Sequence, residues 1–133
     1  MNDDCIFCKI CKGEAPSFKV YEDADTVAFM DIMPQATGHA LVISREHAAN
    51  VFEISDQAAA AVMRSVKKVA TAVRAALAPD GVMIAQFNGA AAGQTVWHYH
   101  VHIIPRTEGV PLQIHARERG DMDEIRALGE KIS

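Results

Sequence analysis

The sequence predicts a single α+β domain in which strands outnumber helices. Five short segments carry the alternating or continuous apolar pattern of strands, and one long segment repeats valine at helical spacing. The chain has 133 residues, which suffices for one core and is too short for two domains. Half of the residues are hydrophobic, as in a globular protein. We therefore expect one domain over residues 1–133.

The elements follow one another as strands interrupted by helices. The expected order is a short amphipathic helix at 5–10, strands at 18–22, 26–32 and 39–44, a long helix from Ser55 to Ala78, strands at 82–87 and 98–104, and a weak helix or a tail at 123–131. Ser55 suits the N-cap of the long helix, and Pro79-Asp80-Gly81 is a stop signal. Pro105 is expected to end the last strand.

Composition and charge exclude several kinds of partner. The formal net charge is −4 at pH 7, and no run of Lys or Arg stands out, which argues against a nucleic-acid backbone. No apolar run reaches the length of a transmembrane helix, and residues 1–4 lack the basic start of a signal peptide. We expect a cytoplasmic protein whose partners include neither nucleic acid nor a membrane.

All three cysteines lie within the first dozen residues, at Cys5, Cys8 and Cys11. Their spacing is typical of metal ligands, and their number is odd. Because the cytosol keeps thiols reduced, we do not expect a disulfide framework.

Histidine occupies every second position at His98, His100 and His102, with apolar or aromatic residues between. In an extended chain the three imidazoles share one face, and Tyr99 and Val101 face the other way. Imidazole is neutral or charged near pH 7, so three in line can supply a nucleophile, a proton carrier or a metal ligand. A tag would lack the interleaved apolar residues, and three core histidines would be costly to bury without partners.

Small residues fill the loop from Asn88 to Thr95 that precedes the histidines. Such residues let backbone N–H groups approach an anion, and Asn, Gln and Thr add side-chain donors. Taken alone, the loop is more typical of an ordinary hairpin turn. Its place directly before three aligned histidines favours a phosphate cradle.

Residues 93–103, Gly-Gln-Thr-Val-Trp-His-Tyr-His-Val-His-Ile, resemble the signature of the histidine triad (HIT) family. Segments 5–10, 27–32 and 38–43 are similar to bacterial members of its Hint branch. The resemblance covers about residues 5–106 and leaves 107–133 as a tail without an assigned motif. It implies a nucleotide-binding fold with a five-stranded antiparallel sheet, which pairs across a homodimer into a ten-stranded sheet.

The resemblance also implies a reaction, the hydrolysis of nucleoside phosphoramidates or related conjugates such as adenosine phosphoramidate or lysine-linked AMP. His100 would attack the α-phosphorus and form a nucleotidyl-histidine that water hydrolyses. His102 would contact a phosphate oxygen, and His39 would lie behind the triad as an additional histidine. The ligand would be a purine nucleotide of the AMP or GMP type, and no organic cofactor is implied.

Further residues match family contacts with the nucleotide. Asp31 matches the carboxylate that accepts both ribose hydroxyls, although on sequence alone it could equally begin a turn. Asn88, the Gly93 backbone, Gln94 and Thr95 match the phosphate site, where Thr95 stands at a position that is often serine. An apolar slot for the base would be lined by Ile6, Phe7, Ile10 and Phe29, each of which also suits an ordinary core.

Zinc-binding members of the family complete a C-x-x-C pair with two histidines. Here the set would be Cys5, Cys8, His47 and His98, a closed structural site for Zn²⁺. Cys11 offers a second C-x-x-C pair with Cys8, and many members of the family fold without the cysteines and without metal.

Two other functions stay open at this point. A metalloenzyme would bind a catalytic metal through His98, His100 and His102, or through two of them. A nucleotide-binding protein without significant turnover is the other alternative. The number of metal ions bound per chain distinguishes the metalloenzyme from the hydrolase. Single-turnover labelling distinguishes the hydrolase from a protein that only binds the nucleotide.

Overall fold

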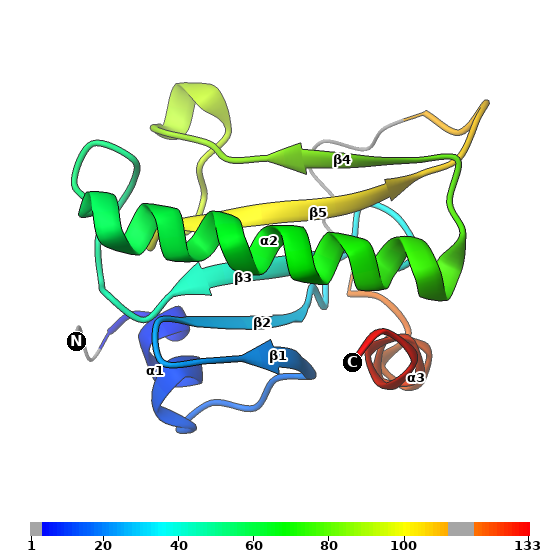
Figure 1. Cartoon of the computed structure of the whole chain (residues 1–133), viewed down its shortest axis with the longest axis horizontal. Coiled ribbons are helices and arrows are strands. Elements are labelled where there is room, and N and C mark those ends of the chain that lie inside the picture. The colour runs from blue at the N-terminus through cyan, green and yellow to red at the C-terminus, as the bar shows by residue number, and fades with distance from the viewer. Residues whose placement is uncertain (1–3, 112–118) are drawn as a thin grey trace.

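The computed structural model describes residues 4–111 and 119–133, which fold around one antiparallel sheet (Figure 1). In chain order the described elements are α1 (Ile6–Lys12), β1 (Lys19–Glu22), β2 (Thr26–Met30), β3 (Ala40–Ser44), α2 (Asp56–Leu77), β4 (Gly81–Ala85), the 3₁₀ turn η1 (Ala90–Ala92), β5 (His100–Arg106) and α3 (Met122–Ile132). The strand order is β1-β2-β3-β5-β4, with every neighbouring pair antiparallel. The predicted five-stranded α+β fold is confirmed.

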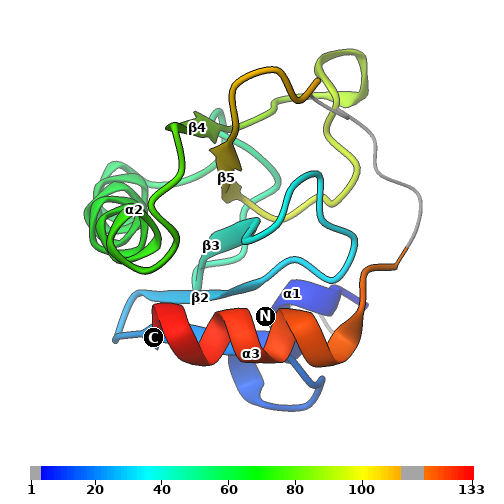
Figure 2. The ribbon, with the colours of Figure 1, turned by 90° about the vertical axis from the view of Figure 1, so that its right-hand side faces the viewer.

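Alternation along the strands divides the core between the two faces of the sheet. Ala28, Val42 and Val101 belong to the larger cluster, which packs under α2. Phe29 and Leu41 belong to a smaller cluster that includes residues of α1. Figure 2 shows α2 and α1 on opposite sides of the sheet. The even positions of β5, which carry His100 and His102, therefore face the side of α1.

The long helix begins where the sequence predicted. The Ser55 hydroxyl accepts a hydrogen bond from the Ala58 N–H at 3.1 Å, which satisfies a donor that the first turn leaves free. The Glu46 carboxylate in turn accepts from the N–H and the hydroxyl of Ser55. The helix ends at Leu77 with Ala78 in the left-handed region, just before the predicted stop. Its buried stripe includes the valines at positions 62, 66, 69 and 73.

The fifth strand differs from the prediction at both ends. It begins at His100, so His98 precedes it, and it runs through Pro105 to Arg106. Proline lacks the N–H that a sheet interior requires, yet Pro105 pairs with Val82 of β4. The pairing of β5 with β3 has already ended at Ile103, so no partner on that side needs the missing donor.

The C-terminal segment forms a true helix, where the sequence left a weak helix or a tail. Asp121 caps α3 by accepting hydrogen bonds from the N–H groups of Asp123 and Glu124. Ile125 and Ile132 are buried in the larger core cluster. Residues 112–118 of the predicted tail, like residues 1–3, lie outside the described residues. No helix in the described part of the chain combines the length and apolar character needed to cross a membrane.

Candidate active site and metal centre

A cavity of about 880 Å³ opens on the α1 side of the sheet. One part of its wall is apolar and comes from α1, β2 and β3, and the other part is polar. The cavity brings together most of the predicted nucleotide contacts, namely Ile6, Phe7, Ile10, Phe29, Asp31, Gly93, Thr95, His100 and His102. An apolar slot beside a cluster of polar groups matches what a nucleotide presents, a flat base at one end and a phosphate at the other.

The main chain holds the neutral His100 ring in one tautomer. Its Nδ1–H donates to the carbonyl oxygen of His98 at 2.6 Å, and a carbonyl can only accept. The proton of the neutral ring is therefore on Nδ1, and Nε2 carries a free lone pair. Burial lowers the pKa of His100, although its bond to the His98 carbonyl acts in the opposite direction. The edge contact of its ring with Phe7, at 5.2 Å between centroids, fixes its orientation further.

His39 and His102 form a second ordered pair. The backbone N–H of Gln35 donates to His39 Nδ1 at 3.1 Å, so the proton of His39 is on Nε2. His39 Nε2–H then donates to His102 Nδ1 at 2.9 Å, which leaves the proton of His102 on Nε2. Burial, reinforced by neighbouring histidines, lowers the pKa of His39 to about 3 and that of His102 to about 4. Both rings are thus neutral at pH 7, and His102 offers the cavity an N–H donor.

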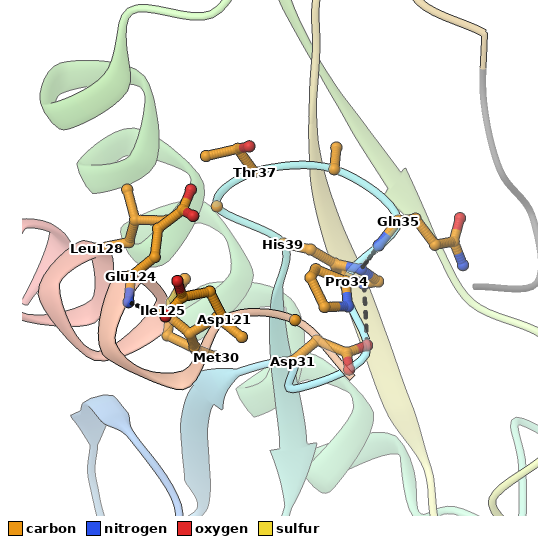
Figure 3. Close-up of a pocket in the computed structure, with 13 residues that line it drawn as sticks. Met30, Asp31, Pro34, Gln35, Thr37, His39, Asp121, Glu124, Ile125 and Leu128 are labelled. Carbon is orange, nitrogen blue, oxygen red and sulfur yellow. Dashed lines mark hydrogen bonds and ion pairs between the residues drawn. The ribbon is translucent and has the colours of Figure 1, made fainter. Parts of the chain in front are cut away.

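Asp31 follows the last residue of β2 and lies beside His39 (Figure 3). Its Oδ1 accepts a hydrogen bond from the Met33 N–H at 2.8 Å, and its Oδ2 is 3.5 Å from His39 Nε2. Burial raises the pKa of Asp31 to about 6, although the bond from Met33 acts in the opposite direction. The carboxylate therefore retains unused acceptor capacity in a poorly hydrated position, which suits a ligand with paired hydroxyl donors.

The loop before β5 contributes its backbone and Thr95 to the cavity, but the predicted role of Gln94 needs correction. The Gln94 side chain is 4% exposed and turns inward. Its Oε1 accepts from the Gly89 N–H at 2.8 Å, and its amide nitrogen donates to the Ala49 carbonyl at 2.5 Å. Because the amide group of Gln94 makes these bonds within the protein, this side chain stabilises the loop and is not available to a phosphate.

The side-chain amide of Asn88 is likewise hydrogen-bonded within the protein. Its Oδ1 accepts from the Val51 N–H at 2.8 Å, and its Nδ2 donates to Gln86 Oε1 at 2.8 Å. Within the part of the chain that the structure describes, neither Asn88 nor Gln94 lines the cavity. Of the predicted phosphate contacts in this loop, Gly93 and Thr95 line the cavity, and the Gly93 N–H already donates to the Ala90 carbonyl at 3.0 Å.

A second cluster lies next to the cavity and unites the four predicted zinc ligands, Cys5, Cys8, His47 and His98. His98 Nδ1 is 3.2 Å from Cys5 Sγ and 3.5 Å from Cys8 Sγ. His47 Nδ1 is 3.2 Å from Cys8 Sγ and 3.3 Å from His98 Nδ1. Tetrahedral zinc with ordinary bond lengths separates a sulfur and a nitrogen ligand by about 3.5 Å and two nitrogens by about 3.3 Å. The donor set therefore fits zinc.

The proton positions agree with this fit. His98 Nε2–H donates to the Ser44 carbonyl at 2.6 Å, so the lone pair of its Nδ1 points to the cysteines. Cys11 lies apart, with its thiol 3.8 Å from the Ser44 carbonyl, and burial raises the pKa of this thiol. A thiol that keeps its proton is a poor metal ligand, which separates Cys11 from the C-x-x-C pair.

The three strand histidines do not come together as one group of metal ligands. Among the described residues, no candidate group of metal ligands contains His98, His100 and His102 together. A different group joins Asp31, His39 and His102. However, the N–H of Gln35 requires the lone pair of His39 on Nδ1, so His39 Nε2 keeps its proton and has no lone pair for a metal.

A backbone carbonyl as partner of His100 is expected from the chemistry of an imidazole nucleophile, but sequence reasoning could not say which main-chain groups orient the histidines. The carbonyls of Ser44 and His98 and the N–H of Gln35 hold three histidines, and their side-chain identities carry no signal of this role. It also missed further residues of the cavity wall, among them Met33, Leu41 and Val96. Leu41 and Val96 have the ordinary apolar character of a core.

Comparison with known proteins agrees with this arrangement. The HIT domain family model matches residues 12–109. Adenosine 5'-monophosphoramidase hnt1 of Schizosaccharomyces pombe is 44% identical over 135 aligned residues, covering 97% of this chain and 96% of that protein. A Hit-like protein from Bartonella henselae has a TM-score of 0.92 at 42% identity, with 99% of this chain and 96% of that chain covered. A Zn-bound histidine triad family protein from Mycobacterium smegmatis has a TM-score of 0.85 at 35% identity, with coverage of 96% and 89%.

Proposed function

Because the chain belongs to the HIT domain family, we propose that it hydrolyses nucleoside phosphoramidates or related nucleotide conjugates through His100. The observation that carries the proposal is the hydrogen bond from His100 Nδ1–H to the His98 carbonyl at 2.6 Å. It leaves Nε2 unprotonated on a buried ring at the wall of the nucleotide-sized cavity. The similarity to a phosphoramidase of Schizosaccharomyces pombe supports this substrate class.

The reaction has two steps. His100 Nε2 attacks the α-phosphorus, a P–N bond forms to the imidazole, and the P–N bond to the leaving amine breaks. The amine departs with a proton taken from the site or from water. Water then attacks the same phosphorus and breaks the bond to His100, which yields the nucleoside monophosphate and the free histidine. The His98 carbonyl stabilises the positive charge that the ring acquires in the first step.

The polar wall supports the phosphate and the apolar wall supports the base. His102 Nε2–H and the Thr95 hydroxyl are donors for phosphate oxygens, on which charge develops during attack. Asp31 accepts the ribose hydroxyls. The base lies in the slot lined by α1 and β2, and this slot consists of Ile6, Phe7, Ile10 and Phe29.

Zinc would be structural in this protein. The similarity to a Zn-bound family protein from Mycobacterium smegmatis and the donor geometry both support bound Zn²⁺ at Cys5, Cys8, His47 and His98. Four protein ligands leave no position for substrate, so the ion supplies folding energy and no catalysis. It would hold α1, which carries three of the four residues of the base slot, against the segment that leads into β5.

A homodimer is also proposed. The outer edge of β4 has no partner strand within the described residues, and unpaired edges favour association. Ile84 on β4 is 42% exposed and Phe52 is 84% exposed. The Val51 N–H bonds to Asn88, so the segment that contains Phe52 lies beside the loop that follows β4. Pairing of β4 with a second β4 would extend the sheet to ten strands.

The test is a hydrolysis assay with adenosine and guanosine 5'-phosphoramidates, run with and without a chelator. We expect turnover of at least one substrate by the wild-type protein and none by His100→Ala. Binding of both nucleotides without turnover of either would favour a nucleotide-binding protein that is not a hydrolase. Turnover that persists in His100→Ala would refute the covalent mechanism.

A further inference from the structure

The C-terminal helix lies outside residues 12–109, which match the family model, yet it contacts the residues on both sides of Asp31. The N–H of Gly120, just before α3, donates to the carbonyl of Ile32 at 2.8 Å. Inside α3, Gly129 lies so close to Met30 that a Cβ there would be 3.1 Å from Met30 Cγ. The residue before Asp31 and the residue after it are thus each held by a glycine of this segment.

Both contacts depend on the absence of a side chain. A Cβ at Gly120 would lie 2.9 Å from the Ile125 side chain and 3.0 Å from the ring of Pro34. The end of the flexible Ile125 side chain can move away, but the contact with the proline ring is tighter than nine in ten real Cβ contacts, and this rigid ring can shift only together with its backbone. A side chain at Gly120 would therefore displace the loop after Asp31 by a few tenths of an ångström.

Packing between the two glycine contacts is incomplete. A cavity of about 230 Å³ separates the loop from Pro34 to His39 from the first turns of α3 (Figure 3). Ile125 and Leu128 line its helix side. Met30, Asp31 and Gln35 line both this cavity and the nucleotide cavity, so Asp31 stands in the wall between them. With a void at its back, the position of Asp31 depends on the few close contacts beside it.

We propose that Gly120 and Gly129 are positioning residues, which hold Asp31 where its carboxylate meets the ribose hydroxyls of the nucleotide. The inference rests on the proposed function, because it assigns a purpose to the ribose contact of that same site. The inference predicts that variants of these glycines lose ribose recognition only. Displacing the loop should weaken ribose recognition and leave the chemistry at His100 unchanged, since His100 lies on β5 and is held by His98.

The test compares Gly129→Ala and Gly120→Ala with wild type on two substrates, adenosine 5'-phosphoramidate and its 2',3'-dideoxy analogue. Hydrogen bonds to a charged group are strong, so weakening them should raise KM for the first substrate roughly tenfold. The kcat should stay within about twofold, and KM for the dideoxy analogue should not change, because that substrate makes no ribose contact.

The control variant is Ala127→Gly, at an exposed position of α3 between the two contacts. Glycine is a poorer helix former than alanine, so this change weakens α3 without adding an atom near Asp31. By the same scale Gly129→Ala should strengthen the helix, and a KM defect that appears with undiminished melting temperature would separate positioning from loss of folding. Ala127→Gly should keep the wild-type KM.

Three results would overturn the inference. They are an equal rise of KM for both substrates, a rise in Ala127→Gly as large as in Gly129→Ala, and wild-type kinetics in both glycine variants. If wild-type protein hydrolyses neither substrate, the proposed function fails separately. The comparison is then made with dissociation constants of AMP and 2',3'-dideoxy-AMP, and the absence of a ribose-dependent loss in the glycine variants would refute the positioning role.

Discussion

At the scale of single residues, main-chain groups decide what the histidines can do. The His98 carbonyl fixes the proton of His100 on Nδ1, and the Gln35 N–H fixes that of His39 on Nε2. His100 therefore presents a lone pair to the cavity. His39 donates to His102 Nδ1, so His102 presents an N–H donor. The alternation of histidines in the sequence predicted which side chains share a face. It could not predict which main-chain groups fix their tautomers, because carbonyl and N–H groups belong to every residue.

Asp31 gives the protein a specific pH dependence. Its pKa is raised to about 6 by burial, whereas a ribose acceptor must be ionised. Nucleotide affinity should therefore fall as the pH drops through about 6, by about tenfold per pH unit below that value. Asp31→Asn should bind AMP roughly 10-fold to 100-fold more weakly at pH 7.5, since hydrogen bonds to charged groups contribute about 1.5–3 kcal/mol. Calorimetric titration with AMP from pH 5 to 8 measures both effects.

The phosphate of AMP also titrates near pH 6, but it does so equally for both proteins. The difference in affinity between wild type and Asp31→Asn thus reports the carboxyl group alone, and a constant difference across the pH range would contradict the assignment.

The contribution of Asp31 to the stability of the fold depends on pH in the opposite direction. Because the folded pKa of Asp31 exceeds its ordinary value, this group stabilises the fold below about pH 4, and the stabilisation is lost as the pH rises through about 6.

At the scale of elements, the Cys/His cluster of the proposed zinc site connects the proposed base slot to His100. α1 begins at Ile6, directly after Cys5, and contains Cys8 as well as Phe7 of the base slot. His98 offers its ring to the cysteines and its carbonyl to His100. A metal bound here would restrain both sides of the cavity through one ion.

Zinc content should follow the ligand set. Cys5→Ser and Cys8→Ser should each lower bound zinc well below one ion per chain, and the melting temperature should fall by roughly 5 °C or more, since even 1 kcal/mol shifts a domain of this size by several degrees. Cys11→Ser should keep its zinc, because Cys11 lies outside the cluster. Elemental analysis measures the zinc content, and thermal denaturation measures the melting temperature. Equal zinc loss in all three variants would mean that the ligand set is wrong.

Prediction of the elements succeeded where the apolar period was strong and failed where tertiary contacts decide. The valine stripe and Ser55 predicted α2 to within a residue. α3 was underestimated because the predicted start at Asp123 left out its cap, Asp121, and because Ile125 and Ile132 are sparse apolar residues on a polar background. Pro105 was expected to end β5, but the strand continues because β3 no longer pairs there.

At the scale of the whole molecule, the sheet separates a packed core on one face from the candidate functional site on the other. The face under α2 is packed by the larger core cluster, and the face of α1 carries the cavity and the metal centre. The division follows from the alternation of β5, in which Val101 and Ile103 are buried under α2 while His100 and His102 face the cavity. The sequence could predict this division, but the orientation of Gln94 and Asn88 depends on loop contacts with residues 49 and 51 far away in the sequence.

The free edge of β4 should make the protein a dimer at micromolar concentration. Ile84→Lys should shift it to a monomer, because a lysine in an edge strand opposes pairing with another edge. Val110→Lys is the matched control, since Val110 is similarly exposed at 52% but lies in the loop after β5. Sedimentation velocity distinguishes the states. A wild-type monomer, or equal dissociation of both variants, would argue against pairing through β4.

The central claim is that His100 becomes covalently nucleotidylated, and mass spectrometry of the intact protein tests it most directly. Wild-type protein is mixed with excess adenosine 5'-phosphoramidate, quenched within milliseconds under denaturing conditions that preserve the acid-labile P–N bond, and digested. The account predicts one adenylyl group per chain, located on the peptide that contains His100 and absent from His100→Ala. Turnover without a labelled peptide, or a label on another residue, would contradict it.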